Sequence, residues 1–238
     1  MHNEEIRNRV LIQLYKRYYE DGFASPIDTE QVVQEAGIPS DGSDLAFRNV
    51  VYLAQSSLIK GEKPSGQKHP KWISITPYGI ETVEIKEKEF AKLHNDIRFK
   101  ILAKLYEYSF TDQGEDTILV DINFIKSLGL NEFDKNLLIG DINYLHNKGL
   151  IEGNRQTSVL YPYQVHIVSK GIDAIENVIN RSLVSIANSE THEKARAEEI
   201  TNEPDKRSKL QRFRDFVGEN AGWIELVANV VRASLTGG

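Results

Sequence analysis

The stretch from Leu45 to Gly61, LAFRNVVYLAQSSLIKG, is the part of the sequence that decides the fold. At about 100° per residue its apolar and polar residues separate onto two faces, which predicts an amphipathic helix. The apolar face comprises Ala46, Phe47, Val50, Val51, Leu53, Ala54 and Leu58. The outward face comprises Arg48, Asn49, Tyr52, Gln55 and Ser56. A buried back with long hydrogen-bonding side chains outside suits contacts with nucleic-acid bases, and it also describes any solvated helix.

This helix belongs to an internal repeat. The segment IRNRVLIQLY at Ile6–Tyr15 is echoed by IRFKILAKLY at Ile97–Tyr106, an offset of 91 residues. Further along the chain the offset is 92, as when LIKG at Leu58–Gly61 is followed by LIEG at Leu150–Gly153. We place the one-residue slip in the polar connector between Tyr19 and Ile27, because insertions cost little in surface loops. The sequence therefore predicts two copies of one fold, residues 1–92 and 93–180.

The same order of elements is expected in both copies. An amphipathic helix is followed by a polar connector, a short helix, the long helix, an alternating β-hairpin and a closing helix. In the first copy the short helix spans Thr29–Ala36, with Asp28 or Thr29 as its N-cap. Thr76 and Pro77 predict the start of a helix that continues to about His94 and joins the copies. The predicted fold class is mainly α with small β-hairpins, that is, α+β.

Two signatures in each copy resemble the winged helix-turn-helix superfamily. They are LIKG at Leu58–Gly61 with ISITPYGIETVE at Ile73–Glu84, and GLIEG at Gly149–Gly153 with VHIVSKGIDAIE at Val165–Glu176. The resemblance covers about three quarters of the chain and implies tandem winged helix domains. In that superfamily the third helix enters the major groove of DNA, and the hairpin, called the wing, contacts the backbone or the minor groove. Fold alone does not establish function.

Transferring these roles by position implies a set of DNA-contacting residues in the first copy. They are Arg48, Asn49, Tyr52, Gln55 and Ser56 on the third helix, with Lys63, Lys68 and Lys71 in the wing. In the second copy Arg48 and Asn49 are replaced by Gly140 and Asp141, and a carboxylate repels phosphates. We therefore expect the first copy to contact double-stranded DNA and the second copy to pack or to dimerise.

Two functions follow from this resemblance. The first is a sequence-specific DNA-binding protein that regulates transcription. The alternative is an adaptor, of the segregation or scaffold type, whose tandem winged helices bind protein partners without contacting DNA. The formal net charge of -6 argues against nucleic acid covering the whole surface, because neutralising phosphates requires local positive charge, and it leaves open a local basic patch.

Composition and motif spacing exclude several other classes. The chain has no cysteine, so disulfides and thiolate metal sites are excluded. Its six histidines are scattered without the spacing of metal ligands, and no glycine-rich phosphate loop or Gly-x-Ser-x-Gly motif occurs. We predict no catalytic activity, no cofactor and no metal. Without a signal peptide or an apolar run of ~18 residues, the sequence predicts a soluble, cytoplasmic protein without a membrane span.

The composition changes after residue 180. Residues 181–209 predict a charged linker, and residues 210–238 predict an amphipathic helical segment. Such a helix can dock on its own domains, form a homodimer, or be offered to a partner protein. We favour the homodimer, because a winged helix protein gains affinity by binding two half-sites. The residues expected at this oligomerisation surface are Trp223, Ile224, Val227, Val230 and Val231.

Overall fold

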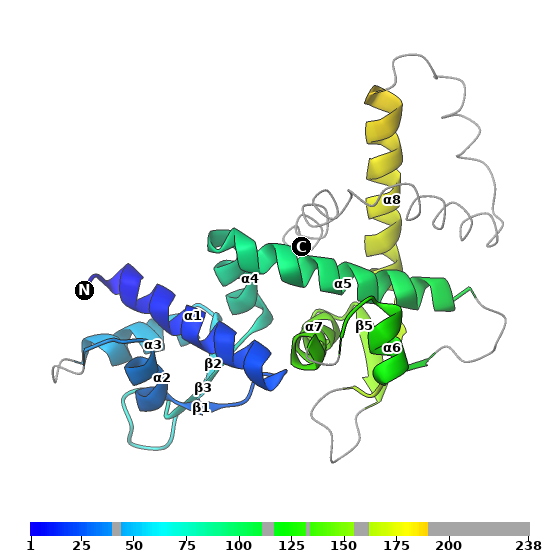
Figure 1. The fold of residues 1–238 in the computed structure, drawn as a ribbon. Helices are drawn as coiled ribbons and strands as arrows, with labels where there is room; N and C mark the ends of the chain where they lie inside the picture. Colours follow the sequence, from blue (N-terminus) through cyan, green and yellow to red (C-terminus); the bar gives the residue numbers. More distant parts are fainter. Residues whose placement is uncertain (40–43, 111–116, 132–133, 155–161, 190–238) are drawn as a thin grey trace. The chain divides into compact units, whose positions relative to one another are not determined.

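The computed structural model describes residues 1–39, 44–110, 117–131, 134–154 and 162–189, with side chains as far as residue 179 (Figure 1). Within these residues the chain is mainly helical, with two small three-stranded antiparallel sheets. The predicted α+β class is therefore confirmed. The chain divides into two compact units. The first unit is Met1–Ala91 with Asn131–Asn147, and the second is Lys92–Leu130 with the chain from Lys148 onward.

The first copy contains a third strand besides the expected hairpin. Its elements are α1 (Asn3–Asp21), β1 (Ile27–Asp28), α2 (Thr29–Glu35), α3 (Leu45–Gln55), β2 (Ile59–Glu62), β3 (Trp72–Ile75) and α4 (Pro77–Lys86). The sheet order is β1-β3-β2, with Ile27 and Ile59 paired to Ile73 and Ile75. The sequence did not predict β1, because two residues are too few to show an alternating pattern.

The second copy repeats this order of elements. It contains α5 (Lys88–Tyr108), β4 (Ile118–Leu119), α6 (Ile122–Ser127), α7 (Lys135–Asn147), β5 (Ile151–Asn154), β6 (Gln164–Ile167) and α8 (Ser169–Ser189). Its sheet order, β4-β6-β5, is equivalent to that of the first copy. Ile118 pairs with Val165 as Ile27 pairs with Ile73, so the offset is still 91 at this strand. The one-residue slip therefore lies after β1, and its predicted place before Ile27 is wrong.

A tyrosine–glutamate hydrogen bond also recurs in both copies. The Tyr15 hydroxyl donates to Glu84 Oε1 at 3.2 Å, and the Tyr106 hydroxyl donates to Glu176 Oε1 at the same distance. Each bond joins the first helix of a copy to its last. Burial raises the pKa of the Tyr106 phenol, and the neighbouring Glu176 carboxylate raises it further. The repeat thus extends from sequence to individual polar contacts.

Helix boundaries agree with most of the capping signals. Asp28 caps α2 by accepting hydrogen bonds from the backbone of Glu30 and Gln31, and Thr76 caps α4 by accepting from Gly79. The helix expected from Pro77 to His94 is wrong as a single element. It is divided at Glu87, whose backbone angles of φ -107° and ψ 79° are not helical, and α5 begins at the next residue.

The end of the chain is described only in part. Helix α8 continues to Ser189, so the first residues of the predicted linker 181–209 are helical. The rest of the linker and the segment 210–238 lie outside the described residues. They include the expected oligomerisation residues Trp223, Ile224, Val227, Val230 and Val231. Among the helices that are described, none is long and apolar enough to span a membrane.

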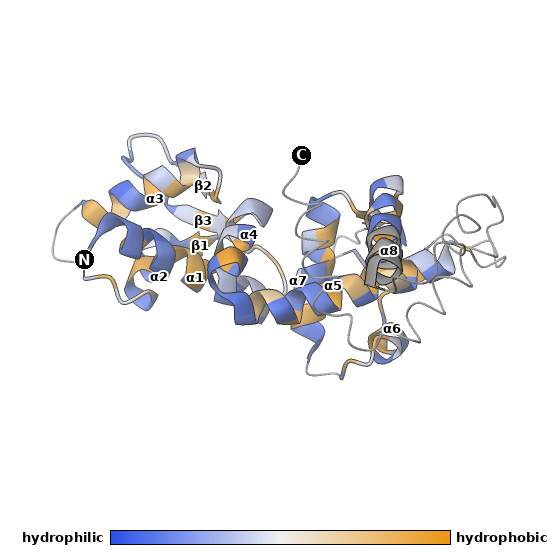
Figure 2. Cartoon of the chain, turned by 90° about the horizontal axis from the view of Figure 1, so that it is seen from above, coloured by the Kyte–Doolittle hydropathy of each residue, from blue (hydrophilic) through white to orange (hydrophobic). Residues whose placement is uncertain are grey.

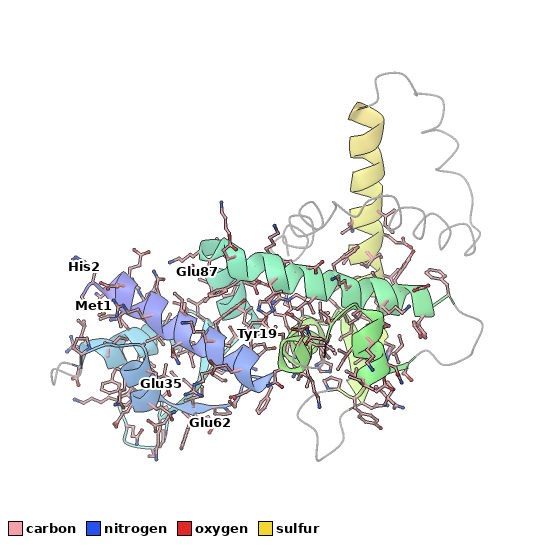
Figure 3. The ribbon with its side chains drawn as sticks, viewed as in Figure 1. Met1, His2, Tyr19, Glu35, Glu62 and Glu87 are labelled. Atoms are coloured by element: carbon pink, nitrogen blue, oxygen red, sulfur yellow. The ribbon has the colours of Figure 1, made fainter. Side chains whose placement is uncertain are left out.

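Helix α7 packs on α1 within the first unit. The Tyr18 hydroxyl donates to the backbone oxygen of Gly140 at 2.8 Å, and the Tyr19 hydroxyl donates to Asp141 Oδ1 at 3.2 Å. The Asn143 amide donates to the oxygen of Gly22 at 2.9 Å. Figure 3 shows Tyr19 at this contact, and Figure 2 shows hydrophobic and hydrophilic residues alternating along the helices. By the sequence repeat α7 belongs to the second copy, yet it packs within the first unit.

This packing buries the face of α7 that is equivalent to the outward face of α3. Asp141 and Tyr144, equivalent to Asn49 and Tyr52, are 0% and 1% exposed. The Tyr144 hydroxyl donates to Glu81 Oε1 of α4 at 2.9 Å. Position 140 is a glycine, whereas the equivalent position 48 is an arginine. The tyrosine rings of α1 occupy the space that a side chain at position 140 would need.

A left-handed residue after the third helix gives a small stability prediction. Ser57 has φ 59°, and the equivalent Gly149 has φ 66°. Left-handed backbone strains a residue that has a Cβ atom, and glycine avoids this strain. Ser57→Gly is expected to raise the free energy of unfolding by about 0.5 kcal/mol, and Gly149→Ser to lower it, as measured by urea denaturation. A loss of stability in Ser57→Gly would contradict this.

Candidate nucleic-acid interface

Helix α3 buries one side and exposes the other. Ala46, Val50 and Leu53 are buried, as predicted. The side chains that face solvent form a stripe along the helix, consisting of Leu45, Arg48, Tyr52 and Gln55. These positions are three or four residues apart and therefore lie on one face. Three of the five residues expected on the outward face occupy this stripe.

Asn49 is not an outward residue. Its side chain is 5% exposed, and its amide donates to Asn3 Oδ1 at 3.0 Å and to the Leu45 backbone oxygen at 2.9 Å. Position 49 is three residues after Ala46 and four before Leu53, so it shares their buried face. A buried amide needs partners, and the contact with Asn3 at the start of α1 supplies one. The prediction that Asn49 lies on the outward face of the helix is therefore wrong.

Tyr52 and Ser56 have local partners. Tyr52 is 50% exposed, and the Arg7 guanidinium of α1 lies over its ring, 4.3 Å from the centroid. This is a favourable cation–π geometry. Ser56 is the C-cap of α3, and its backbone N–H donates to the Tyr52 oxygen. Ser56 is only half-buried, but its backbone role is to close the helix.

The wing is the hairpin β2–β3 with its connection, residues 63–71, and its base is tied to α2. The Thr29 hydroxyl donates to the Pro70 oxygen at 2.8 Å, and the Thr29 N–H donates to the Lys71 oxygen at 2.9 Å. The Lys71 N–H in turn donates to the Glu62 oxygen at 3.0 Å. These bonds hold the backbone at the end of the connection in place, and therefore also the position from which the Lys71 side chain extends.

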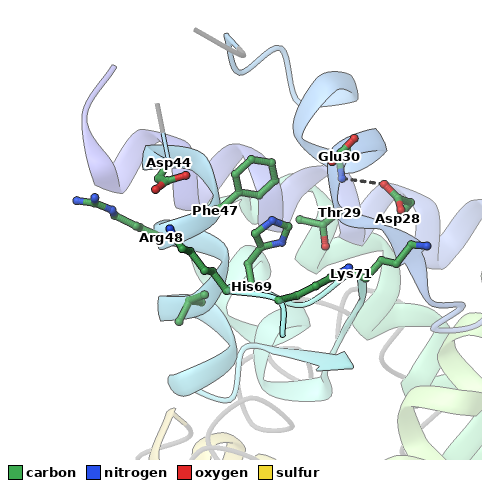
Figure 4. A pocket seen from close by; sticks show the side chains of 11 residues that line it. Asp28, Thr29, Glu30, Asp44, Phe47, Arg48, His69 and Lys71 are labelled. Carbon is green, nitrogen blue, oxygen red and sulfur yellow. Dashed lines mark hydrogen bonds between the residues drawn. The ribbon is translucent and has the colours of Figure 1, made fainter. Parts of the chain in front are cut away.

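The wing also stacks on α3. The His69 ring lies parallel to Phe47, with centroids 4.0 Å apart and planes 12° apart (Figure 4). The sequence pattern places Phe47 on the apolar face of the helix and gives His69 no role in the site. No local signal could have found this pair, since the contact depends on how the hairpin closes over the helix.

The start of α2, helix α3 and the wing surround one cavity of about 790 Å³ within the first unit (Figure 4). Its lining residues are Asp28, Thr29, Glu30, Asp44, Phe47, Arg48, Val51, Gln67, Lys68, His69 and Lys71. The structure therefore brings together Arg48, Lys68 and Lys71 from the predicted set. Lys63 is exposed on the wing outside the cavity lining, as are Tyr52 and Gln55 on the helix.

The described cations of the first unit include side chains with ion pairs and side chains without them. Arg9, Arg17 and Lys86 form ion pairs with glutamates, whereas within the described residues Arg48, Lys63 and Lys68 form none. Lys71 lies over the ring of Trp72, with Nζ 5.4 Å from its centroid. Of the acidic lining residues, Asp28 is engaged in capping α2. Unpaired cations attract anions, so this face suits phosphate groups.

A metal or cofactor site has no comparable support. Over the part of the chain that the structure describes, no three His, Asp or Glu side chains gather closely enough to hold a metal ion. Compared with protein families, curated proteins and solved structures, the chain matches no family model, no curated sequence and no solved structure. The assignment of a function therefore rests on the geometry of the α3–wing face.

Proposed function

We propose that this protein binds double-stranded DNA through α3 and the wing of its first copy, as a sequence-specific regulator of transcription. In this proposal each copy is a winged helix. The order helix, strand, helix, helix, strand, strand supports this assignment, as does the sheet order β1-β3-β2. The resemblance at Leu58–Gly61 and Ile73–Glu84 supports it independently.

The observation that carries the proposal is the convergence of Arg48, Lys68 and Lys71 on one cavity beside an exposed helix face. In the proposed complex Arg48 and the lysines neutralise phosphates, and Gln55 reaches base edges in the major groove. Asn49 has no part in this contact, because it is buried. The equivalent face of α7 is buried as well, so the proposal assigns DNA binding to the first copy alone.

The salt dependence of DNA affinity tests the proposal. If Arg48, Lys63, Lys68 and Lys71 each neutralise a phosphate, log K for a random-sequence duplex should fall against log salt with a slope of about -3 to -4. Replacing the three lysines with glutamine should reduce the slope to about -1 and weaken binding by at least about tenfold at 0.1 M salt. Fluorescence anisotropy of a labelled duplex at several salt concentrations measures both quantities.

The matched control changes three cations that already form ion pairs. Arg9, Lys100 and Lys104 each pair with a carboxylate on their own helix, and their replacement by glutamine changes the net charge by the same amount. This control variant should keep the slope of the unmodified protein. Equal losses in both variants would contradict an interface on the wing. No duplex binding by the unmodified protein at low salt would refute DNA binding and favour the adaptor.

A further inference from the structure

The cavity beside α3 is lined by more kinds of side chain than a phosphate site requires. A backbone phosphate needs cations at the rim, which Arg48 and Lys68 supply. Phe47 and Val51 add an apolar wall, both side chains being half-buried. The stacked pair of Phe47 and His69 is an aromatic surface of the kind on which nucleobases stack. At about 790 Å³ the cavity also falls within the size range of small-molecule sites, roughly 300–1,000 Å³.

We propose that this cavity binds one unpaired nucleotide. Its phosphate contacts Arg48 and Lys68, and its base lies against the pair of Phe47 and His69. The nucleotide can belong to DNA, as a base outside the helical stack, or be a free mononucleotide. The first source rests on the proposed DNA binding, whereas the second does not. A base within an intact duplex is stacked on its neighbours and therefore cannot also lie against Phe47 and His69.

Charged groups lie at both ends of the cavity. Figure 4 shows Arg48 and Asp44 at one end, Phe47 and His69 in the middle, and Glu30 with Asp28 and Lys71 at the other end. Arg48 attracts the phosphate, and the Glu30 carboxylate can accept a hydrogen bond from an amino group of the base. Asp44 lies beside Arg48 and lowers the positive charge there. This arrangement favours a single phosphate over a polyphosphate.

The walls of the cavity are fixed before any ligand arrives. Thr29 holds Pro70 and Lys71 by two hydrogen bonds, and the His69 ring is held against Phe47. Ligand binding therefore requires little ordering of the wing, and little of the binding free energy is lost in holding the wing in place. A preformed site of this kind is expected to discriminate between unpaired and paired bases.

Two probes test the proposal on the full chain. The first compares a labelled duplex with the same duplex carrying one unpaired adenine, and the unpaired form should bind about tenfold more tightly because stacking adds to phosphate contacts. The second is deoxyadenosine monophosphate, titrated by isothermal calorimetry, which should show saturable binding. Preference for the unpaired adenine identifies the DNA source, and saturable binding of the mononucleotide alone identifies the free source.

Variants assign either result to the cavity. Phe47→Leu keeps an apolar side chain and removes the ring, so the preference for the unpaired adenine and the binding of the mononucleotide should both fall about tenfold. Tyr78→Leu removes an exposed aromatic ring of α4 outside the cavity lining and should change neither. Lys68→Gln, at an exposed position, tests the phosphate contact without touching the core.

The outcomes separate this proposal from DNA binding itself. Equal affinity for both duplexes, without mononucleotide binding, overturns the nucleotide site and leaves DNA binding intact. Absence of all DNA binding, with mononucleotide binding that Phe47→Leu abolishes, supports the site and refutes DNA binding. Nucleotide binding that persists unchanged in both Phe47→Leu and Lys68→Gln also overturns the proposed site.

Discussion

Replacing Gly140 with arginine, the residue at equivalent position 48, is expected to lower the free energy of unfolding by about 3 kcal/mol or more. A Cβ atom at Gly140 would lie 2.7 Å from Cδ1 and 2.9 Å from Cε1 of Tyr19. The rest of the side chain would bring a charge into a buried contact between α1 and α7. Urea denaturation of the full chain, followed by far-ultraviolet circular dichroism, measures the loss.

The reciprocal substitution, Arg48→Gly, is the matched control. Arg48 is exposed and forms no ion pair within the described residues, so its replacement should cost only the helix propensity of glycine, about 1 kcal/mol. Its main effect should be on DNA affinity. If both substitutions cost the same stability, the packing of Tyr19 on Gly140 is not what determines the residue at position 140.

Replacing Gly79 with alanine is expected to cost about 3 kcal/mol of unfolding free energy. A Cβ atom there would lie 2.1 Å from the backbone oxygen of Leu58, an atom that cannot move without the strand that follows it. The same oxygen accepts hydrogen bonds from the N–H and the hydroxyl of Thr76. The clash would therefore disturb the base of the wing. Gly171→Ala should behave alike, since its Cβ would lie 2.2 Å from the Leu150 oxygen.

Gly129→Ala distinguishes this clash from the general cost of replacing a glycine. Gly129 has φ +71°, and an added Cβ would meet nothing within 4 Å. Its replacement should cost about 1 kcal/mol through backbone strain alone. Thermal unfolding monitored by circular dichroism ranks the three variants. A Gly129→Ala variant less stable than Gly79→Ala would show that the close approach at Leu58 is relieved by a small shift.

Local patterns in the sequence were sufficient for most of the fold. Helical periodicity located α1, α2 and α3, and the capping residues Asp28 and Thr76 marked two helix starts, because these signals depend on neighbouring residues alone. The strand β1 was missed because it exists only through its pairing with β3. The break at Glu87 was missed because nothing in the local composition interrupts the helical pattern.

The face of a helix was harder to predict where the partner comes from elsewhere in the chain. Asn49 is polar, yet it is buried by its contact with Asn3. Asp141 and Tyr144 are polar as well, yet α1 and α4 cover them. The polarity of a residue does not by itself determine whether it is buried. A polar side chain is buried where another part of the chain packs on it and supplies hydrogen-bond partners. The convergence of Arg48 and the wing lysines could be predicted because the hairpin directly follows α3, whereas the stacking of His69 on Phe47 depends on side-chain orientation.

The placement of α7 determines how this protein can be dissected. The chain leaves the second unit at Asn131 to add α7 to the first unit, and it returns at Lys148. A fragment that ends at the repeat boundary, residue 92, would lack the helix that covers Tyr18 and Tyr19. The uncovered aromatic rings would promote self-association of the fragment. A fragment that carries the α3–wing face together with α7 must therefore extend to at least residue 147, and it then also contains α5 and α6 of the second unit.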